Sequence, residues 1–440
     1  MGVGPSRRYF KIHQDSEVTS DHEDPSGYSA REREVLSSPR ASSVKPRVAL
    51  VHDWLVSMRG GERCFEVLCE LFPDADVYTL VHRKGHVSPV IEKHSIRTSF
   101  IQRLPLSFTH YQYYLALFPL AIRSFAFHDY DLVISSSHCV AKGLRIPDNV
   151  CHLAYIYTPM RYIWDQFDAY FADGRAGWLT RTVMGLLRRP LQRWDVSSND
   201  GVYRFVAISE HVARRIRSYW GREATVLYPP VDWQLFAASD QDEGFYLLVS
   251  ALVPYKRVDL AIQAANRMKF PLKIIGAGQD ENRLRKLAGS SVELLGWQPD
   301  SEIRQHYARC KALLFPGEED FGIVPLEAMA CGKPVIAYAR GGALETVVSL
   351  VPRDLLVRKE NPIGMLPRVS DDQYPTGVFF NEQTLESLVG AVETLECHQS
   401  RFDPEKIRAH VEPFDRKYFK ERMRQLIETS WEDFRRTRLC

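Results

Sequence analysis

Residues 315–332 read FPGEEDFGIVPLEAMACG, and this stretch decides the fold. The apolar run that ends at Phe315 is typical of a buried parallel strand. Pro325 suits the first position of a helix, and Gly332 suits the position after its end. The stretch therefore predicts a strand, a loop and a helix, which together make half of a βαβ unit.

The loop between this strand and helix carries three acidic residues, 318–320, and Glu327 falls in the first turn of the predicted helix. Free backbone N–H groups near Gly322 and Ile323 would attract a phosphate, and carboxylates would accept hydrogen bonds from sugar hydroxyls. Composition gives equal weight to a plainer interpretation, in which Glu327 favours the helix dipole and the loop acids are solvated.

Strands and helices alternate on both sides of this stretch. We predict an α/β fold with two Rossmann-like doubly wound domains, over residues 47–228 and 229–403, joined at a rigid Pro229-Pro230 pair. A helix within 404–440 spaces its apolar residues for packing one face back onto the body.

Two segments do not fit the alternation. Residues 1–46 are rich in Ser, Asp, Glu and Arg without periodicity, which predicts a disordered N-terminal tail. Residues 353–376 interrupt the second domain with charges and prolines, which predicts a surface insertion.

Composition excludes several classes of protein. The 440 residues are 45% hydrophobic, so both domains can bury a core, and 57 basic residues against 55 acidic ones leave too little net charge for a dedicated nucleic-acid binder. The eight cysteines form no Cys-x-x-Cys pair, and no His, Cys and Asp cluster has metal-ligand spacing. We expect reduced thiols, no metal, no cofactor and a cytoplasmic protein without a membrane span.

The acidic motif belongs to a longer pattern. Glu319, seven intervening residues and Glu327, followed by AMACGKPVI and then GGALET (341–346), closely resemble the signature of family 4 glycosyltransferases, which are retaining enzymes of the GT-B fold. The resemblance extends from about Arg47 to Arg422 and includes the motifs VHDWLVSMRGGER (51–63), YDLVISSSHCVAKG (130–143), YTPMRYIWD (157–165), LYPPVD (227–232) and ALVPYKRVDLAI (251–262). These motifs look most like those of enzymes that transfer mannose or a related sugar in surface-polysaccharide and lipopolysaccharide assembly.

The resemblance implies roles for the residues of this motif. Glu327 would bind the ribose of a nucleotide, and Glu319 would reach the hydroxyl groups of the donor sugar. The backbone of Phe321, Gly322 and Ile323 would line the sugar pocket.

Further residues are implied outside the motif. Lys256, with Arg257 beside it, would neutralise the donor diphosphate, which leaves only if its developing charge is held. Gly60 and Gly61 would bring backbone and a helix N-terminus to the interdomain cleft. The plainer and less favoured interpretation is that this glycine pair marks an ordinary tight turn.

The sequence departs from the family pattern at two positions. Family members usually carry an arginine where this chain has Ala251, so Arg257 or a residue elsewhere must supply the second charge, or turnover is weakened. Many relatives have a histidine where this chain has Tyr157, and tyrosine is a poor base near neutral pH. His138 would face the same cleft from a neighbouring loop, although a lone histidine is as often a structural hydrogen-bonding residue.

Residues 274–278, IIGAG, only partly match a dinucleotide-binding fingerprint, because no third glycine follows. We interpret them as a strand-to-helix turn rather than as part of a nicotinamide enzyme.

Two stretches mix basic with aromatic or apolar residues, namely 93–128 and 175–194. Such a mixture suits an anionic membrane surface, where the protein would be peripheral on the inner face of the plasma membrane. Buried helices of the first domain explain the apolar residues almost as well.

Together these observations predict a retaining glycosyltransferase that moves a sugar from a nucleotide-sugar donor, mannose from GDP-mannose, onto a glycan or lipid-linked acceptor. Two alternatives remain at this point: a UDP-sugar-dependent enzyme of the same fold, and a catalytically decayed nucleotide-sugar binding protein.

Overall fold

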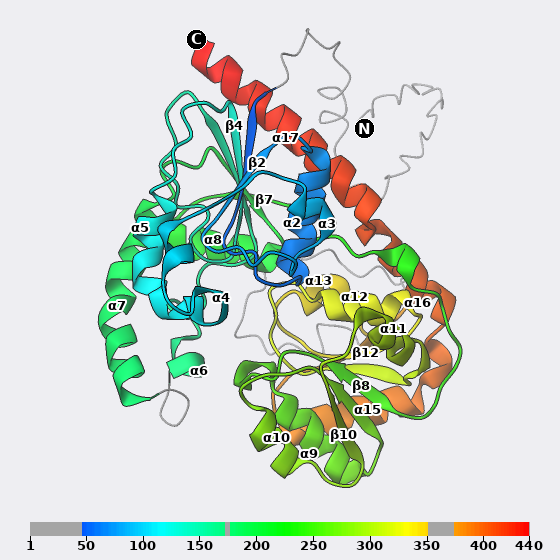
Figure 1. The fold of residues 1–440 in the computed structure, drawn as a ribbon. Coiled ribbons are helices and arrows are strands. Elements are labelled where there is room, and N and C mark those ends of the chain that lie inside the picture. Colours follow the sequence, from blue (N-terminus) through cyan, green and yellow to red (C-terminus); the bar gives the residue numbers. More distant parts are fainter. Residues whose placement is uncertain (1–45, 172–176, 351–373, 440) are drawn as a thin grey trace, which may run out of the picture. The chain divides into compact units, whose positions relative to one another are not determined.

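The computed structural model describes residues 46–171, 177–350 and 374–439, which all belong to one unit of the fold. The described residues carry two parallel β-sheets with helices packed against them (Figure 1). The α/β class and the two doubly wound sheets predicted from sequence are therefore confirmed. The predicted tail, 1–46, and the predicted insertion, 353–376, lie almost wholly outside the described residues.

The first sheet has the strand order β3-β2-β1-β4-β5-β6-β7, and all its neighbours are parallel. Its strands are β1 (Val48–His52), β2 (Asp76–Thr79), β3 (Ile96–Thr98), β4 (Leu132–Ser137), β5 (Cys151–Ile156), β6 (Arg204–Ala207) and β7 (Ala224–Val226). The chain order reverses between β1 and β4, and ligands of such sheets bind outside the carboxyl ends of the strands at this switch point.

The second sheet has the order β10-β9-β8-β11-β12-β13 and is also parallel. Its strands are β8 (Tyr246–Val249), β9 (Leu272–Ile275), β10 (Val292–Gly296), β11 (Ala312–Phe315), β12 (Val335–Tyr338) and β13 (Gly377–Phe380). Its switch point lies between β8 and β11, so the loops after these two strands are the expected binding loops.

Helices connect the strands of each sheet. The first half contains α2 (Gly60–Leu71), α3 (Pro89–Glu92), α4 (Ser107–His110), α5 (Phe118–Ile122), α6 (Phe167–Phe171), α7 (Trp178–Ser197) and α8 (Glu210–Trp220). The second half contains α9 (Val258–Met268), α10 (Glu281–Leu287), α11 (Asp300–Arg309), α12 (Ile323–Ala330), α13 (Ala343–Thr346), α15 (Leu385–Cys397), α16 (Pro404–Val411) and α17 (Arg416–Leu439).

Five strands near the centres of the two sheets are buried along their whole length. Every residue of β1, β4 and β5 is buried in the first sheet, and every residue of β11 and β12 is buried in the second. Continuous apolar runs form such strands because helices cover both faces of a parallel sheet.

Helix α12 begins two residues earlier than its sequence suggested. Gly322 precedes it with a φ of +97°, and Ile323 is its first residue, so Pro325 is the third position rather than the first. Glu327 therefore lies in the second turn. A backbone φ in the left-handed region is accessible to glycine, and this conformation turns the chain into the helix before the proline is reached.

The predicted helix within 404–440 is two helices, α16 and α17, separated by a 3-10 turn at Glu412–Phe414. Pro413 lacks the N–H that a continuous helix needs, which accounts for the break. Helix α17 packs back onto the first half, where it contacts α2 and β5. Figure 1 shows α17, in red, running past α2.

Candidate functional site

The switch point of the second sheet brings Lys256 and Glu319 together. Lys256 ends the 3-10 turn Pro254–Lys256 that follows β8, and Glu319 lies in the loop after β11. The Nζ atom of Lys256 forms an ion pair with Oε1 of Glu319, and both side chains are mostly buried. A small pocket here is lined by Leu248, Val249, Ser250, Lys256, Leu314, Phe315, Pro316, Gly317 and Glu319.

Glycines allow the loop that carries Glu319 to cross its neighbours closely. A Cβ atom at Gly317 would lie 2.9 Å from the Cα of Lys256, and one at Gly342 would lie 2.2 Å from the Cα of Phe321. The N–H of Gly342 donates to the carbonyl oxygen of Glu319 at 2.8 Å. The glycine pair of the GGALET motif therefore holds the acidic loop by backbone contact, for which a side chain leaves no room.

The N-terminus of α12 adjoins this loop and meets the first half. Phe321 is buried and stacks on Tyr228 with ring centroids 5.4 Å apart. A Cβ atom at Gly60 would lie 3.1 Å from Cδ1 of Ile323, so the first residues of α2 and α12 are close neighbours. The structure thus brings together Lys256, Glu319, residues 321–323 and Gly60.

Glu327 lies deeper along α12. Its Oε2 accepts a hydrogen bond from the hydroxyl of Tyr307 at 2.9 Å. Burial raises its pKa to about 7, although Arg63 of α2 acts in the opposite direction. The carboxyl group is thus close to its titration point at neutral pH, and Arg63 is a cation of the first half that favours its ionised form.

Asp320, the next residue after Glu319, binds two arginines of the first half. Oδ2 of Asp320 lies 2.6 Å from Nη2 of Arg161, and Oδ1 lies 2.7 Å from Nη1 of Arg215. Burial disfavours the aspartate anion, yet the two guanidinium groups lower its pKa to about 2. Asp320 is therefore ionised at neutral pH, and it links the acidic loop to the loop after β5 and to α8.

The loop after β5 carries Arg161 and is tied to α7. Two side chains of α7, Arg188 and Gln192, donate to the carbonyl oxygen of Ile163 at 2.9 and 2.7 Å. Nε1 of Trp164 donates to Oδ2 of Asp195, also on α7, at 2.8 Å. These contacts fix the backbone on the C-terminal side of Arg161.

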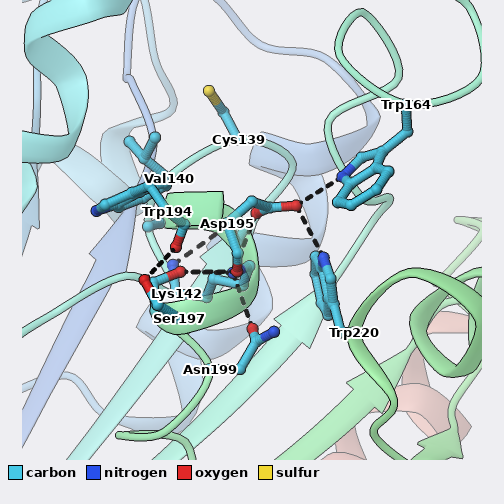
Figure 2. A network of polar contacts seen from close by, with 12 residues as sticks. Cys139, Val140, Lys142, Trp164, Trp194, Asp195, Ser197, Asn199 and Trp220 are labelled. Atoms are coloured by element: carbon cyan, nitrogen blue, oxygen red, sulfur yellow. Dashed lines mark hydrogen bonds and ion pairs between the residues drawn. The ribbon is translucent and has the colours of Figure 1, made fainter. Parts of the chain in front are cut away.

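Asp195 belongs to a buried polar network (Figure 2). Its Oδ1 lies 3.1 Å from Nζ of Lys142, and its Oδ2 accepts a second indole N–H, from Trp220. Lys142 also donates to Oγ of Ser198 and Oδ1 of Asn199, both at 2.8 Å. A buried cation with this many acceptors is satisfied, so the network is a structural anchor between the loop after β4, α7 and α8.

At the switch point of the first sheet, Asp53 orients His138. Asp53 follows β1 and accepts four backbone N–H groups of residues 138–141 at 2.7–2.9 Å. Nδ1 of His138 lies 3.2 Å from Oδ2 of Asp53, and its ring packs edge-on against Trp54. Burial lowers the pKa of His138, whereas Asp53 acts to raise it. His138 is thus a held, neutral imidazole in the loop after β4.

Tyr157 already has hydrogen-bond partners for its hydroxyl. The group donates to the carbonyl oxygen of Gly61 at 2.8 Å and lies 2.7 Å from Oγ of Ser136. Ser136 in turn contacts Nδ1 of His52 at 3.0 Å. Burial raises the pKa of Tyr157 further above its ordinary value. The side chain therefore positions the start of α2 and has no capacity as a base at neutral pH.

Arg257 is separated from the pocket that Lys256 lines. Its Nε contacts Oδ1 of Asp259 at 3.3 Å, and its Nη1 contacts Gln383. Ala251 is exposed and brings no charge. Although Arg257 follows Lys256 in sequence, its guanidinium therefore points to α9 and to the segment before α15.

Sequence reasoning missed Arg161 and Arg215. The charge of Arg161 within the apolar YTPMRYIWD motif was the one signal that could have drawn attention to it. Arg215 lies on α8 among other arginines, and its sequence neighbours do not distinguish it.

Within the described residues, no group of three or more His, Cys, Asp or Glu side chains could hold a metal ion. None of the helices in 46–171, 177–350 and 374–439 is long and apolar enough to span a bilayer.

The family comparison matches the second half of the chain. Residues 233–399 fit the family described as glycosyl transferases group 1. This range contains Lys256, Glu319 and Glu327, together with both loops of the second switch point.

Relatives in sequence carry related names. An uncharacterized glycosyltransferase of Methanocaldococcus jannaschii is 34% identical over 171 residues, which cover 38% of this chain and 48% of that protein. A GDP-mannose-dependent monoacylated alpha-(1-6)-phosphatidylinositol monomannoside mannosyltransferase of Corynebacterium glutamicum is 34% identical over 172 residues, covering 32% and 45%. The chain thus spans about half the length of these relatives.

A solved structure extends the likeness to the whole fold. HepE of Anabaena, in complex with UDP and glucose, superposes with a TM-score of 0.62 at 17% identity, covering 87% of this chain and all of that one. The likeness supports the GT-B arrangement of two doubly wound sheets, as the sequence predicted. Residues 233–399 thus match the family of glycosyl transferases group 1, and the chain as a whole is similar to glycosyltransferases in sequence motifs and in fold.

Proposed function

We propose that the protein is a retaining glycosyltransferase that takes mannose from GDP-mannose and transfers it to a glycan or a lipid-linked oligosaccharide. The observation that carries the proposal is the ion pair of Lys256 and Glu319 at the second switch point, beside the N-terminus of α12. The name of the Corynebacterium relative supports GDP-mannose as the donor.

In this proposal Lys256 exchanges its partner when the donor binds. Its ammonium moves its charge interaction from Glu319 to the diphosphate, and the freed carboxylate accepts hydrogen bonds from hydroxyl groups of the sugar. N–H groups at Gly322 and Ile323 add positive potential. Glu327 accepts hydrogen bonds from the ribose.

The chemical step follows from a diphosphate held by charge. The acceptor oxygen forms a bond to the anomeric carbon on the face from which the diphosphate departs, while the bond between that carbon and the phosphate oxygen breaks. The leaving diphosphate takes the proton of the acceptor hydroxyl. His138 contributes a held imidazole near the sugar, and Tyr157 keeps the start of α2 in place, so the protein acts by positioning and charge stabilisation.

Binding is tested by isothermal titration of the purified protein with GDP, UDP, GDP-mannose and UDP-glucose. Selective binding of GDP and GDP-mannose is the expected result. UDP selectivity would replace the donor while keeping the reaction class, and failure to bind all four compounds would overturn the proposal.

Turnover is tested by release of nucleoside diphosphate from the bound donor, with and without lipid-linked acceptors. Glu319→Gln is expected to reduce kcat about a hundredfold or more, since removal of one transition-state contact commonly has this effect. Glu318→Gln is the matched control, because this neighbouring acid is half exposed and contacts His211 at 3.9 Å instead of Lys256. Saturable donor binding without turnover in the wild type would indicate a decayed binding protein.

We further propose that the first half rests on an anionic membrane surface. Trp178 and Leu186 of α7 are 79% and 73% exposed, and Leu106 and Leu120 of the 93–128 stretch are 65% and 64% exposed. Both stretches supply arginines, and 93–128 contains no acidic residue. Arg175 of the second stretch lies outside the described residues.

Cosedimentation with vesicles tests this surface. The wild type is expected to bind vesicles that contain phosphatidylglycerol at low salt and to leave vesicles of pure phosphatidylcholine unbound. A Trp178→Ala, Leu186→Ala double variant is expected to lose binding. Equal recovery with both vesicle types would overturn the membrane proposal without affecting the donor site.

A further inference from the structure

Among the described residues that line the pocket at the second switch point, one is a cation, whereas a nucleoside diphosphate carries at least two negative charges. Lys256 is the cationic residue that lines the pocket at the second switch point. Ala251 is neutral, and Arg257 is engaged by Asp259 and Gln383. Because a diphosphate leaves only when its charge is held, a second cation is needed close to Lys256.

Arg161 of the first half lies close to Lys256. Its guanidinium carbon is 5.6 Å from the ring centroid of Tyr255, the residue immediately before Lys256. Burial lowers the pKa of Lys256 to about 7, and the positive charge of Arg161 contributes to this shift. The two cations are therefore close enough to repel each other when no anion lies between them.

The guanidinium of Arg161 is only partly engaged. Its side chain is 9% exposed, and Nη2 binds Asp320. Its Nε is buried and has no hydrogen-bond partner among the described residues. A buried donor without a partner costs free energy, so an anion that reaches it is favoured.

Asp320 does not depend on Arg161 alone. Arg215 binds its other carboxylate oxygen, and the carbonyl oxygen of Asp320 accepts the hydroxyl of Ser209 at 2.6 Å. One carboxylate thus faces two guanidinium groups. Arg161 can therefore donate some of its N–H groups to a second anion while Arg215 continues to neutralise Asp320.

The backbone that carries Arg161 is held before any ligand arrives. Trp164 is bound to Asp195, and Asp195 is fixed by Lys142 and Trp220 in the buried network (Figure 2). A preorganised cation binds an anion with less reorganisation than a flexible surface arginine.

We propose that Arg161 is the second cation of the donor site and that it binds the diphosphate together with Lys256, in place of a charge at Ala251. This inference rests on the proposed function. It assigns to the first half a contact with the donor diphosphate, so the diphosphate bridges the loop after β5 and the turn after β8.

The test is isothermal titration with GDP or UDP, whichever the wild type binds, and with the matching nucleoside, which lacks phosphates. Arg161→Gln is expected to weaken nucleotide affinity by about tenfold to a hundredfold, the effect of losing a hydrogen bond to a charged group. Affinity for the nucleoside is expected to stay unchanged. Arg217→Gln removes the same charge from exposed α8 surface and is the matched control.

Ala251→Arg provides a measurement that does not disturb Arg161. In the Arg161→Gln background the new arginine is expected to restore most of the lost affinity. In the wild type it is expected to add less than about threefold, because the second charge is already present. A tenfold gain in the wild type would show that the site lacks a second cation and would overturn the inference.

The outcomes separate the two proposals. A wild type that binds no nucleotide overturns the proposed function. A wild type that binds, with Arg161→Gln equally tight, overturns this inference alone. Parallel losses for nucleotide and nucleoside would mean that Arg161 acts only through Asp320, which also overturns it.

Discussion

The carboxylate of Glu345 accepts the backbone N–H of Glu210 at 2.8 Å. Its other oxygen accepts the N–H of His211 at 2.8 Å. The two donors are the first N–H groups of α8, which have no acceptor within the helix. An acidic residue of the second half therefore supplies the cap that a helix of the first half requires, and Ser209 completes it by accepting the N–H of Val212.

Replacing Glu345 with alanine is expected to lower the free energy of unfolding by about 2 kcal/mol, because two charge-assisted hydrogen bonds are lost. Urea unfolding followed by circular dichroism measures the change. Glu386→Ala is the control, since this exposed acid lies in the first turn of α15 and contacts only the exposed Arg267 in the described structure. Equal stability of the two variants would contradict the role of Glu345 as a cap.

The affinity for GDP-mannose is expected to fall as pH rises through the pKa of Lys256, about 7 in the unliganded protein. Lys256 is cationic below this pH and neutral above it, whereas both phosphates of the donor are esterified and keep their charge. Titration calorimetry between about pH 6 and 9 measures the dependence. Lys256→Arg keeps its charge throughout this range and is expected to flatten the curve. If the affinities of the wild type and the variant changed with pH in the same way, Lys256 would not be the group that causes the pH dependence.

Two glycine substitutions are expected to change the free energy of unfolding in opposite directions. Gly342→Ala would place a Cβ 2.2 Å from the Cα of Phe321 and is expected to cost about 3 kcal/mol and to weaken donor binding. Gly185→Ala, inside α7, places its Cβ more than 4 Å from the described residues outside the neighbouring helix backbone, and is expected to add about 0.5–1 kcal/mol. Thermal unfolding of both variants measures the difference, and a tolerated Gly342→Ala would mean that the acidic loop is less closely held.

The buried pair of Lys142 and Asp195 is expected to show strong coupling. Lys142→Met leaves Asp195 without its cation and is expected to cost about 3–5 kcal/mol. A double-mutant cycle with Asp195→Asn, measured by urea unfolding, is expected to give a coupling energy of about 2 kcal/mol. Additive effects of the two substitutions would show that the pair is not an energetic unit.

The pattern of apolar residues in the sequence was sufficient to predict the strands and the class of fold. The strands on either side of the second switch point are short apolar runs, and such runs specify buried parallel strands with few alternatives. The start of α12 was wrong by two residues, because the left-handed backbone at Gly322 begins the helix before Pro325 does. A proline shows where a helix is permitted to begin, while tertiary contacts decide the residue at which it does.

The candidate site was predictable where a motif kept its members on one loop. Glu319 and residues 321–323 lie together because they are neighbours in sequence, and Lys256 joins them through the topology of the sheet. Arg161 and Asp320 come from different halves of the chain, so no local pattern records their contact. The orientation of Arg257 could not be predicted either, since it depends on a contact with Gln383, which is distant in sequence.

Helix α17 has a consequence for the order in which the protein is made. Its residues Phe419 and Phe434 are buried, with Phe419 against Tyr155 of β5 and Phe434 against Tyr203. The whole second sheet precedes α17 in the chain, so the first half leaves the ribosome while its surface around Tyr155 and Tyr203 is still uncovered. The core of the first half is completed only after the second half has been translated, and until then this exposed apolar surface is a target for chaperones.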